Sequence, residues 1–270
     1  MIVTPAAPNE TLTTEANRRQ PARTALITGA GQRIGREIAL DLARHGWQVA
    51  VHYRNSREAA LAVVAEIEAN GGRAAAIAGD LSVAEDVDML IPTCVSKLGA
   101  PCCLINNASE FHLDTLETLT RETWHLHLDI NLKAPVFLAQ SLAANLPTGC
   151  EGNIINIIDQ RVWNLKPDFF SYTISKAGLW TATRTLAQAL APRVRVNAIG
   201  PGPTLIGARQ SEAHFAAQRA STLLNRGADP SDITAALGYL LDARAVTGQL
   251  ICVDGGQHLA WQTPDILGVD

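Results

Sequence analysis

Short apolar runs alternate with longer amphipathic runs along most of the chain. The apolar runs predict strands at residues 23–28, 48–53, 73–78, 102–105, 153–158, 194–199 and 249–253. The runs with helical spacing lie between them, at residues 34–43, 57–70, 85–98, 120–146, 170–190, 210–224 and 232–242. Strands that alternate with helices in this way are typical of one parallel sheet. We therefore predict an α/β fold, a doubly wound parallel sheet of about seven strands with helices on both faces.

The ends of the chain differ from this alternating body. Residues 1–22 are polar, contain three prolines and lack the apolar core of a signal peptide, which predicts a flexible N-terminal tail. We assign residues 23–260 to one domain and residues 261–270 to a C-terminal tail. No apolar run approaches the ~20 residues that a membrane helix needs.

Composition narrows the class of protein. The 270 residues are 47% apolar and 18% charged, with a net charge of −4, which gives neither a nucleic-acid-binding surface nor a polybasic membrane patch. The five cysteines are odd in number and form no Cys-x-x-Cys pair, as expected of reduced thiols. We expect a cytoplasmic enzyme that acts on a small molecule.

A glycine-rich turn follows the first predicted strand and opens the first predicted helix. It contains Gly29, Gly31 and Gly35, with Arg33 and Ile34 between the last two glycines. In a dinucleotide-binding unit such glycines let the backbone approach a pyrophosphate, and the helix N-terminus supplies free N–H groups. The turn therefore predicts a dinucleotide cofactor.

The residues after the second strand bear on the choice of cofactor. An NAD-binding enzyme carries an acidic residue there for the ribose 2′-hydroxyl group. Here the strand ends with Tyr53, Arg54, Asn55 and Ser56, and the first acid is Glu58. Arg54 and its polar neighbours suit a 2′-phosphate, so we predict NADPH/NADP.

Tyr172 and Lys176 form a candidate catalytic pair. Residues four apart on a helix lie on the same face. A nearby ammonium group lowers the pKa of a phenol, which otherwise titrates near ~10, and makes it usable as a general acid. A half-buried tyrosine beside a solvated lysine is the simpler alternative.

A second polar cluster, His125, His127 and Asp129, could suggest a metal site. Residues two apart on a helix do not face each other, and no further ligand completes a tetrahedral set. We predict surface and packing residues, and no metal.

Several motifs together resemble the short-chain dehydrogenase/reductase family over about residues 23–258. The matching pieces are Thr28-Gly29 to Gly35, Asp80, Asn106-Asn107-Ala108, Asn131, Tyr172-x-x-x-Lys176 and Pro201-Gly202. The resemblance implies that Tyr172 delivers a proton, that Lys176 holds the nicotinamide ribose and that Asn131 supports a proton relay. It also implies further cofactor contacts at Asp80, Leu81, Asn107, Ala108, Ser109, Pro201 and Gly202.

Two departures from the family pattern are similar to its pteridine reductases. Arg33 replaces a glycine of the loop, and Asp159 stands thirteen residues before Tyr172, where the family usually has serine. Phe111 resembles the ring that stacks on a bound pterin, and Ser109 would reach the edge of that ring. Trp163, Phe169 and Phe170 precede Tyr172 and could form a pocket wall.

Asp159 decides the expected substrate. A carboxylate repels the oxyanion that develops when a carbonyl group is reduced, whereas it suits protonation of a ring nitrogen during C=N reduction. Asp159 could instead point away from the pocket or cap a turn. The predicted substrate contacts are Arg33, Ser109, Phe111, Asp159 and Tyr172.

The preferred function is NADPH-dependent reduction of a pterin, either a dihydropterin or dihydrofolate. One alternative is an NADPH-dependent carbonyl reductase that acts on a keto, 3-oxoacyl or sugar substrate. A non-catalytic NADP-binding sensor is the other alternative. The resemblance implies a homo-oligomer, commonly a tetramer, without nucleic-acid or membrane partners.

Overall fold

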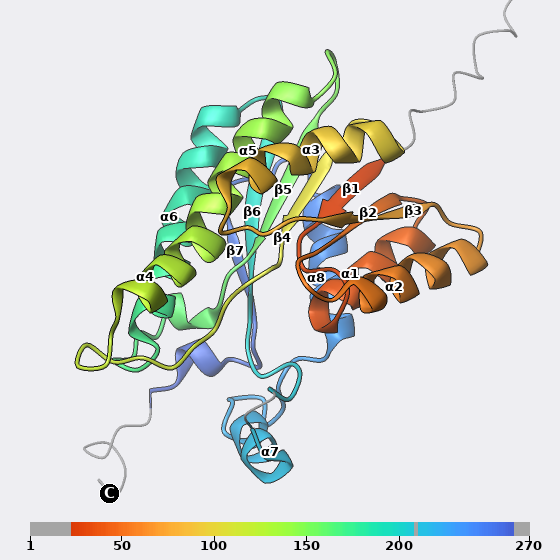
Figure 1. The fold of residues 1–270 in the computed structure, drawn as a ribbon. Coiled ribbons are helices and arrows are strands. Elements are labelled where there is room, and N and C mark those ends of the chain that lie inside the picture. Colours follow the sequence, from red (N-terminus) through yellow and green to blue (C-terminus); the bar gives the residue numbers. More distant parts are fainter. Residues whose placement is uncertain (1–22, 208–209, 262–270) are drawn as a thin grey trace, which may run out of the picture.

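All the predicted strands form one parallel sheet in the computed structural model, which describes residues 23–207 and 210–261 (Figure 1). The strand order is β3-β2-β1-β4-β5-β6-β7. Every pairing is parallel. The strands are β1 (Thr24–Ile27), β2 (Gln48–Tyr53), β3 (Ala74–Ala78), β4 (Cys103–Asn106), β5 (Gly152–Ile157), β6 (Val194–Pro201) and β7 (Leu250–Val253). The order reverses between β1 and β4, which is where such sheets bind ligands.

Helices cover both faces of the sheet, as predicted. One face packs against α1 (Arg33–Arg44), α2 (Arg57–Ala69) and α8 (Pro230–Asp242). The other face packs against α3 (Ala84–Leu98), α5 (Ala134–Asn145) and α6 (Phe170–Leu190). The central strands β1, β4 and β5 are almost entirely buried, and most of their residues are apolar, as expected of strands covered on both faces.

The long helix predicted over residues 120–146 is interrupted. It consists of α4 (Arg121–Leu128), a π-helical turn (Asp129–Lys133) and α5. Such turns occur mostly inside α-helices and often at functional sites, and this one carries Asn131. Helical periodicity alone does not reveal a single widened turn.

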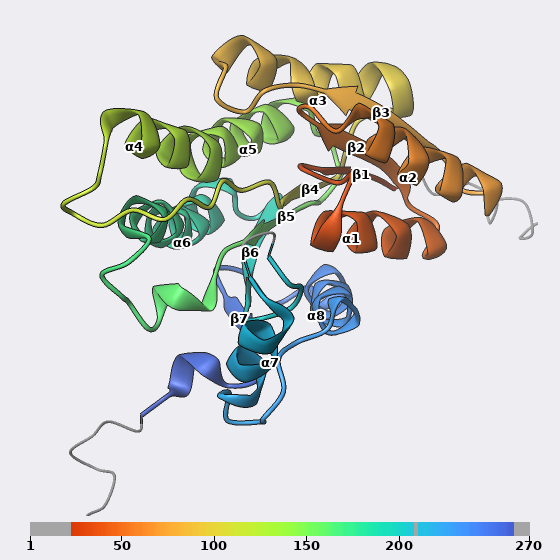
Figure 2. The same cartoon turned by 60° about the horizontal axis from the view of Figure 1, so that its bottom comes forward.

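Two predicted helix boundaries need correction. The segment predicted as helical over residues 210–224 contains only α7 (Glu212–Ala220), which lies beyond the carboxyl end of β6 (Figure 2). The helix predicted over residues 85–98 begins one residue earlier, at Ala84, and Ser82 bonds to Asp80 instead of capping it. The short Asp80–Ser82 turn competes successfully for the hydroxyl group.

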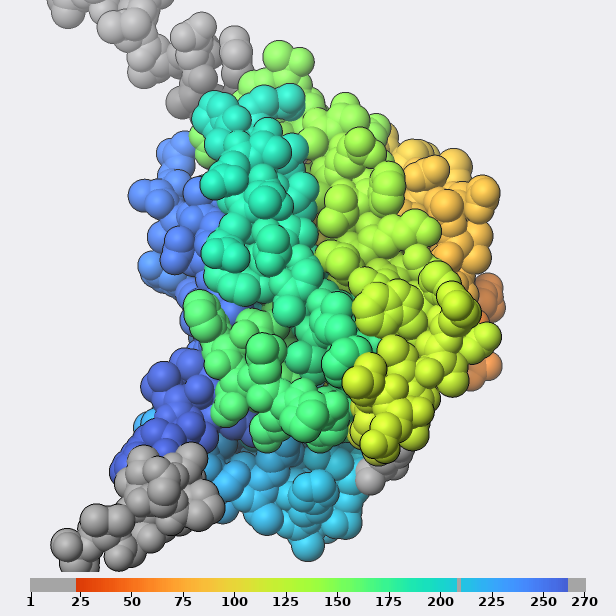
Figure 3. Space-filling model, turned by 90° about the vertical axis from the view of Figure 1, so that its left-hand side faces the viewer, coloured from red at the N-terminus to blue at the C-terminus, as the bar shows by residue number. Residues whose placement is uncertain are grey.

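α5 and α6 lie side by side and form the face seen in Figure 3. Phe137 on α5 and Ile174 on α6 are exposed to solvent. In the part of the chain that the structure describes, every helix is too short or too polar to cross a membrane. The predicted N-terminal tail at residues 1–22, and the predicted C-terminal tail at residues 261–270 apart from its first residue, lie outside the described residues.

Candidate active site

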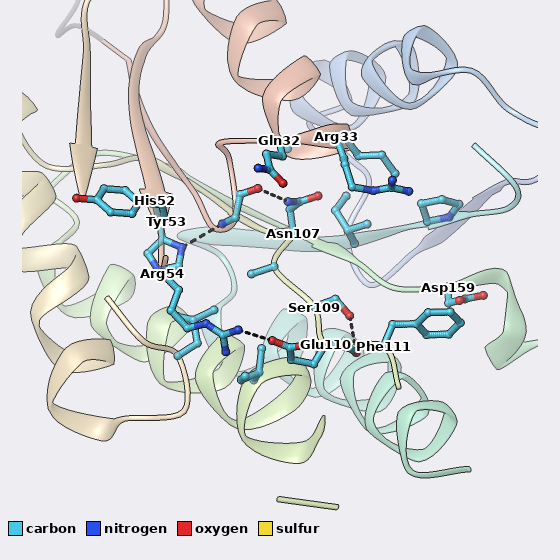
Figure 4. Close-up of a pocket in the computed structure, with 18 of the residues that line it drawn as sticks. Gln32, Arg33, His52, Tyr53, Arg54, Asn107, Ser109, Glu110, Phe111 and Asp159 are labelled. Atoms are coloured by element: carbon cyan, nitrogen blue, oxygen red, sulfur yellow. Dashed lines mark hydrogen bonds and ion pairs between the residues drawn. The ribbon is translucent and has the colours of Figure 1, made fainter. Parts of the chain in front are cut away.

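A pocket of about 560 Å³ opens at the carboxyl ends of the strands, across the point where the strand order reverses. It gathers residues from eight segments of the chain, and Figure 4 shows many of them as sticks. Of the predicted site residues, the lining contains Gly29, Arg33, Ile34, Gly35, Tyr53, Arg54, Asn55, Ser56, Asp80, Leu81, Asn107, Ala108, Ser109, Phe111, Asp159, Tyr172, Lys176, Pro201 and Gly202. The lining also contains residues that we did not predict, namely Gln32, His52, Glu110, Ile130, Ile157 and Ile158.

The glycine-rich turn has the shape that a pyrophosphate requires. Gly29 has φ +62°, and a Cβ atom on Gly35 would lie 2.4 Å from the carbonyl oxygen of Gly29. In this fully described turn Gln32 makes no side-chain capping bond, and the first turn of α1 contains no acidic residue. The free N–H groups and the positive end of the helix therefore face the pocket and fit an anionic cofactor.

His52 holds the glycine-rich turn in place through hydrogen bonds of its imidazole ring. Its Nδ1 accepts a hydrogen bond from the backbone N–H of Gly29 at 3.0 Å, so Nε2 carries the proton and donates to the carbonyl oxygen of Gly79 at 3.0 Å. Burial lowers the pKa of His52 to about 4. The neutral ring thus joins the glycine turn to the end of β3. The sequence shows only that His52 lies near the end of a predicted strand, so it did not reveal this link.

Arg54 lies at the cofactor end of the pocket and forms an ion pair across it. Its guanidinium group is 2.9 Å from a carboxylate oxygen of Glu110, whose other oxygen is 3.0 Å from Nε2 of His112. Glu110 follows β4, so this contact joins segments that are distant in sequence. A local pattern of residues could not have indicated it.

Arg33 points away from Arg54. Its guanidinium group donates to the carbonyl oxygens of Leu205 and Ile206, at 3.0 and 2.7 Å. Its charge therefore lies at the edge formed by the segment after β6 rather than beside Arg54.

The candidate catalytic pair, Tyr172 and Lys176, lies on the face of α6 that lines the pocket, as its spacing predicted. Tyr172 donates a hydrogen bond from its hydroxyl group to Oδ2 of Asp159 at 2.8 Å. Oδ1 of Asp159 accepts from the backbone N–H of Arg161 at 2.8 Å. Asp159 therefore caps the following turn and also faces the phenol, so the two alternatives for this residue coexist. Lys176 donates from Nζ to the carbonyl oxygen of Ile157 at 2.9 Å.

The charges around this pair differ from expectation in one respect. Burial lowers the pKa of Lys176 to about 8, against the opposing effect of Asp159. Burial, together with the charge and hydrogen bond of Asp159, raises the pKa of Tyr172 well above its ordinary value. The pKa of Tyr172 is therefore raised where we predicted a lowering by Lys176, because burial and the adjacent carboxylate outweigh the opposing charge of Arg161.

Two predicted site residues lie behind the lining. Asn131 is buried, and its amide holds the backbone N–H and C=O of Glu110, at 2.9 and 3.0 Å, and the hydroxyl group of Ser175 at 3.0 Å. Gly31 packs against the start of α2, where a Cβ atom would lie 3.2 Å from the backbone nitrogen of Ala60. Both residues support the pocket without lining it.

Aromatic rings form the wall at the other end of the pocket. Phe111 stacks on Phe169 with ring centroids 4.2 Å apart, and its ring contacts Tyr172 edge-on at 4.6 Å. Phe111 remains 43% exposed. Trp163, which we also predicted for this wall, pairs with Trp180 instead. Ser109 lies at the exposed rim, as Figure 4 shows.

Residues 29–258 match a protein-family model described as enoyl-(acyl carrier protein) reductase. This match agrees with the strand order, the glycine turn and the Tyr172–Lys176 pair. The chain belongs to the short-chain dehydrogenase/reductase family. It is an NAD(P)-dependent oxidoreductase of that family, with the predicted Rossmann-type fold.

Solved and curated relatives differ in substrate. The chain is similar to FolM alternative dihydrofolate reductase 1 from Brucella canis, solved with NADP, at 45% identity, with a TM-score of 0.89 and coverage of 91% of this chain and 98% of that one. It also resembles the NADP-bound angucycline C-6 ketoreductase LanV, at 32% identity, a TM-score of 0.81 and coverage of 88% of this chain and 96% of that one. A curated relative, the 3-oxoacyl-[acyl-carrier-protein] reductase of Synechocystis sp., is 35% identical over 87% of this chain and 96% of its own length.

Proposed function

We propose that this protein is an NADPH-dependent reductase of pterins that transfers hydride to a ring C=N bond of a dihydropterin or dihydrofolate. The observation that carries the proposal is the hydrogen bond between Asp159 and Tyr172 in the pocket. The similarity to a dihydrofolate reductase solved with NADP supports it.

The cofactor end of the pocket suits NADPH. The N–H groups of the glycine turn and of the start of α1 would hold the pyrophosphate, and Arg54 would hold the 2′-phosphate. Lys176, at the other end, would donate to the hydroxyl groups of the nicotinamide ribose. When bound, NADPH supplies the hydride.

Tyr172 and Asp159 would manage the proton. The hydroxyl group of Tyr172 keeps its proton at neutral pH because burial and the carboxylate raise its pKa. Asp159 accepts the hydrogen bond of this hydroxyl group at 2.8 Å, so its carboxylate lies directly beside the proton donor. A negative carboxylate here disfavours a developing alkoxide and stabilises a protonated ring nitrogen. The pair is therefore better suited to an imine than to a ketone.

Carbonyl reduction is the second candidate, and the chain's similarity to a ketoreductase and to a 3-oxoacyl reductase favours it. Tyr172 and Lys176 would serve either reaction. Asp159 is the residue that distinguishes the two.

The test is NADPH oxidation with 7,8-dihydrobiopterin, 7,8-dihydrofolate, a 3-oxoacyl thioester and an aryl ketone. We expect turnover of a pterin, a loss of roughly 10²-fold in Asp159→Ser, and normal turnover in the control Asp168→Ser. Asp168 pairs with Arg161 and lies outside the pocket lining. A wild-type enzyme that reduces the ketone or thioester well and ignores both pterins would establish the carbonyl reductase instead.

The outer face of α5 and α6 bears on assembly. Its exposed Phe137 and Ile174 support a homo-oligomer, as the family resemblance implies. Light scattering of the purified chain would test this, and a monomer at micromolar concentration would contradict it.

A further inference from the structure

The segment that carries Phe111 has no regular secondary structure, yet side chains behind the pocket hold it at several points. Residues 107–115 form an irregular connection between β4 and α4. Asn131 holds Glu110 on one side of Phe111. On the other side, His112 donates its backbone N–H to Nε2 of His127 at 3.0 Å.

A chain of three buried polar residues continues from this contact. Nδ1 of His127 lies 2.6 Å from the hydroxyl oxygen of Ser171, and this hydroxyl group makes a short hydrogen bond to the carboxylate of Asp114. Asp114 also accepts from the backbone N–H of Ser171 at 3.2 Å. His127 and Ser171 are fully buried, and Asp114 is 2% exposed. The function proposed above uses none of these three residues.

The hydrogen bonds fix the direction of the chain. Nε2 of His127 accepts a backbone N–H, so the proton of the neutral ring lies on Nδ1 and is donated to Ser171. The hydroxyl group of Ser171 then donates to Asp114. Burial lowers the pKa of His127, which favours this neutral form.

This order is not that of a nucleophilic triad. In a triad the histidine lies between the acid and the serine and removes the proton of the serine hydroxyl group. Here Ser171 lies between the other two residues, donates a hydrogen bond to Asp114 and is fully buried. The cluster therefore has a structural role.

Its position links both sides of the proposed substrate site. Ser171 immediately precedes Tyr172, and Asp114 and His112 follow Phe111 in the irregular segment. Phe170 also donates its backbone N–H to the carbonyl oxygen of Asp114 at 3.2 Å. The same contacts thus fix the backbone beside the proton donor and the backbone beside the stacking ring.

We propose that His127, Ser171 and Asp114 are positioning residues that hold Phe111 at a fixed place beside Tyr172 and so set affinity for a flat ring substrate without touching it. The substrate part of this inference rests on the proposed function. The positioning part does not, because it concerns the segment itself.

The test compares two losses of a buried hydroxyl group on α6. Ser171→Ala breaks the link, whereas Thr183→Val removes a hydroxyl group that is equally buried but bonds to Asn156 and Leu179 rather than to residues 107–115. We expect hydrogen exchange of the amides of residues 109–116 to quicken at least about tenfold in Ser171→Ala and to stay near wild type in Thr183→Val.

Kinetics give the second readout. Ser171→Ala should raise the KM for 7,8-dihydrobiopterin about tenfold, with a change in kcat below about threefold. His127→Gln can still accept from His112 and donate to Ser171, so it should retain low exchange and low KM, whereas His127→Phe should behave like Ser171→Ala.

Two outcomes would overturn the inference. One is equal exchange in Ser171→Ala and Thr183→Val, and the other is equal KM in those two variants. If the wild-type enzyme reduces no pterin, the proposed function fails, but the exchange comparison still decides whether the three residues hold the segment.

Discussion

The two ends of the pocket are built differently. The cofactor end consists of short turns directly after β1, β2 and β3, and His52 joins two of these turns through a neutral ring. The substrate end consists of longer irregular segments after β4, β5 and β6. The first of these segments is held by hydrogen bonds from its backbone to two side chains. These are His127 on α4 and Asn131 on the π-helical turn.

This difference assigns separate tasks to the two ends. The turns at the cofactor end directly follow the strands, at the edge of the sheet where such folds bind their ligands. The irregular segments at the substrate end depend on particular side chains, so they can change substrate without disturbing the sheet. Substitutions at the two ends should therefore affect different kinetic constants.

The largest effect should come from Tyr172→Phe, at the substrate end. The change retains the ring but removes the proton donor, so kcat should fall by ~10²-fold or more. Binding of NADPH, measured by fluorescence titration, should stay within a few-fold of wild type. Tyr239→Phe removes a phenol on α8 outside the pocket lining and serves as the control. Near-normal turnover in Tyr172→Phe would remove this residue from the mechanism.

A smaller effect is expected at the cofactor end. Arg54→Asp replaces the partner of the 2′-phosphate with a repulsive charge, so the Kd for NADPH should rise about 30-fold and that for NADH should change much less. Arg57→Asp makes the same charge change at an exposed position at the start of α2, outside the pocket lining. Equal losses for the two cofactors would show that Arg54 does not recognise the phosphate.

The same difference explains what the sequence could predict. The alternating runs predicted the sheet and its helices, and local motifs predicted Gly29, Arg54 and the Tyr172–Lys176 pair, because each depends on near neighbours in the chain. The bond between Asn131 and Glu110, and the burial of His127, depend on segments brought together only by folding. His127, predicted as a surface or packing residue, lies in a buried polar network; within residues 23–207 and 210–261 no cluster could hold a metal.

The next effect returns to the substrate end. Phe111→Ala removes the ring that stacks on Phe169 and faces the pocket, so affinity for a dihydropterin should fall about tenfold, or ~1–2 kcal/mol. NADPH affinity should change less than about twofold. Phe137→Ala is a matched control, because Phe137 is 46% exposed and lies on α5 away from the pocket. A loss of NADPH affinity equal to that for the pterin would show that the two ends are not separate.

The smallest effect concerns Glu110, which lies in the irregular segment of residues 107–115 but pairs with Arg54 at the cofactor end. The carboxylate of Glu110 and the 2′-phosphate of NADPH would therefore compete for the guanidinium group of Arg54. The two side chains are 39% and 21% exposed, so the pair contributes little energy and Glu110→Gln should tighten NADPH binding only about threefold.

Binding of NADH should not change in Glu110→Gln, because NADH lacks the competing phosphate. His112→Gln is the control, since His112 contacts the other oxygen of Glu110 and leaves the pair with Arg54 in place. The gain for NADPH should also shrink as salt is added, because salt screens partly exposed charges. If NADPH binds more weakly in Glu110→Gln, or if both cofactors bind more tightly by the same factor, Glu110 is not a competitor for Arg54. It would then act on both cofactors alike, through its place in the pocket wall.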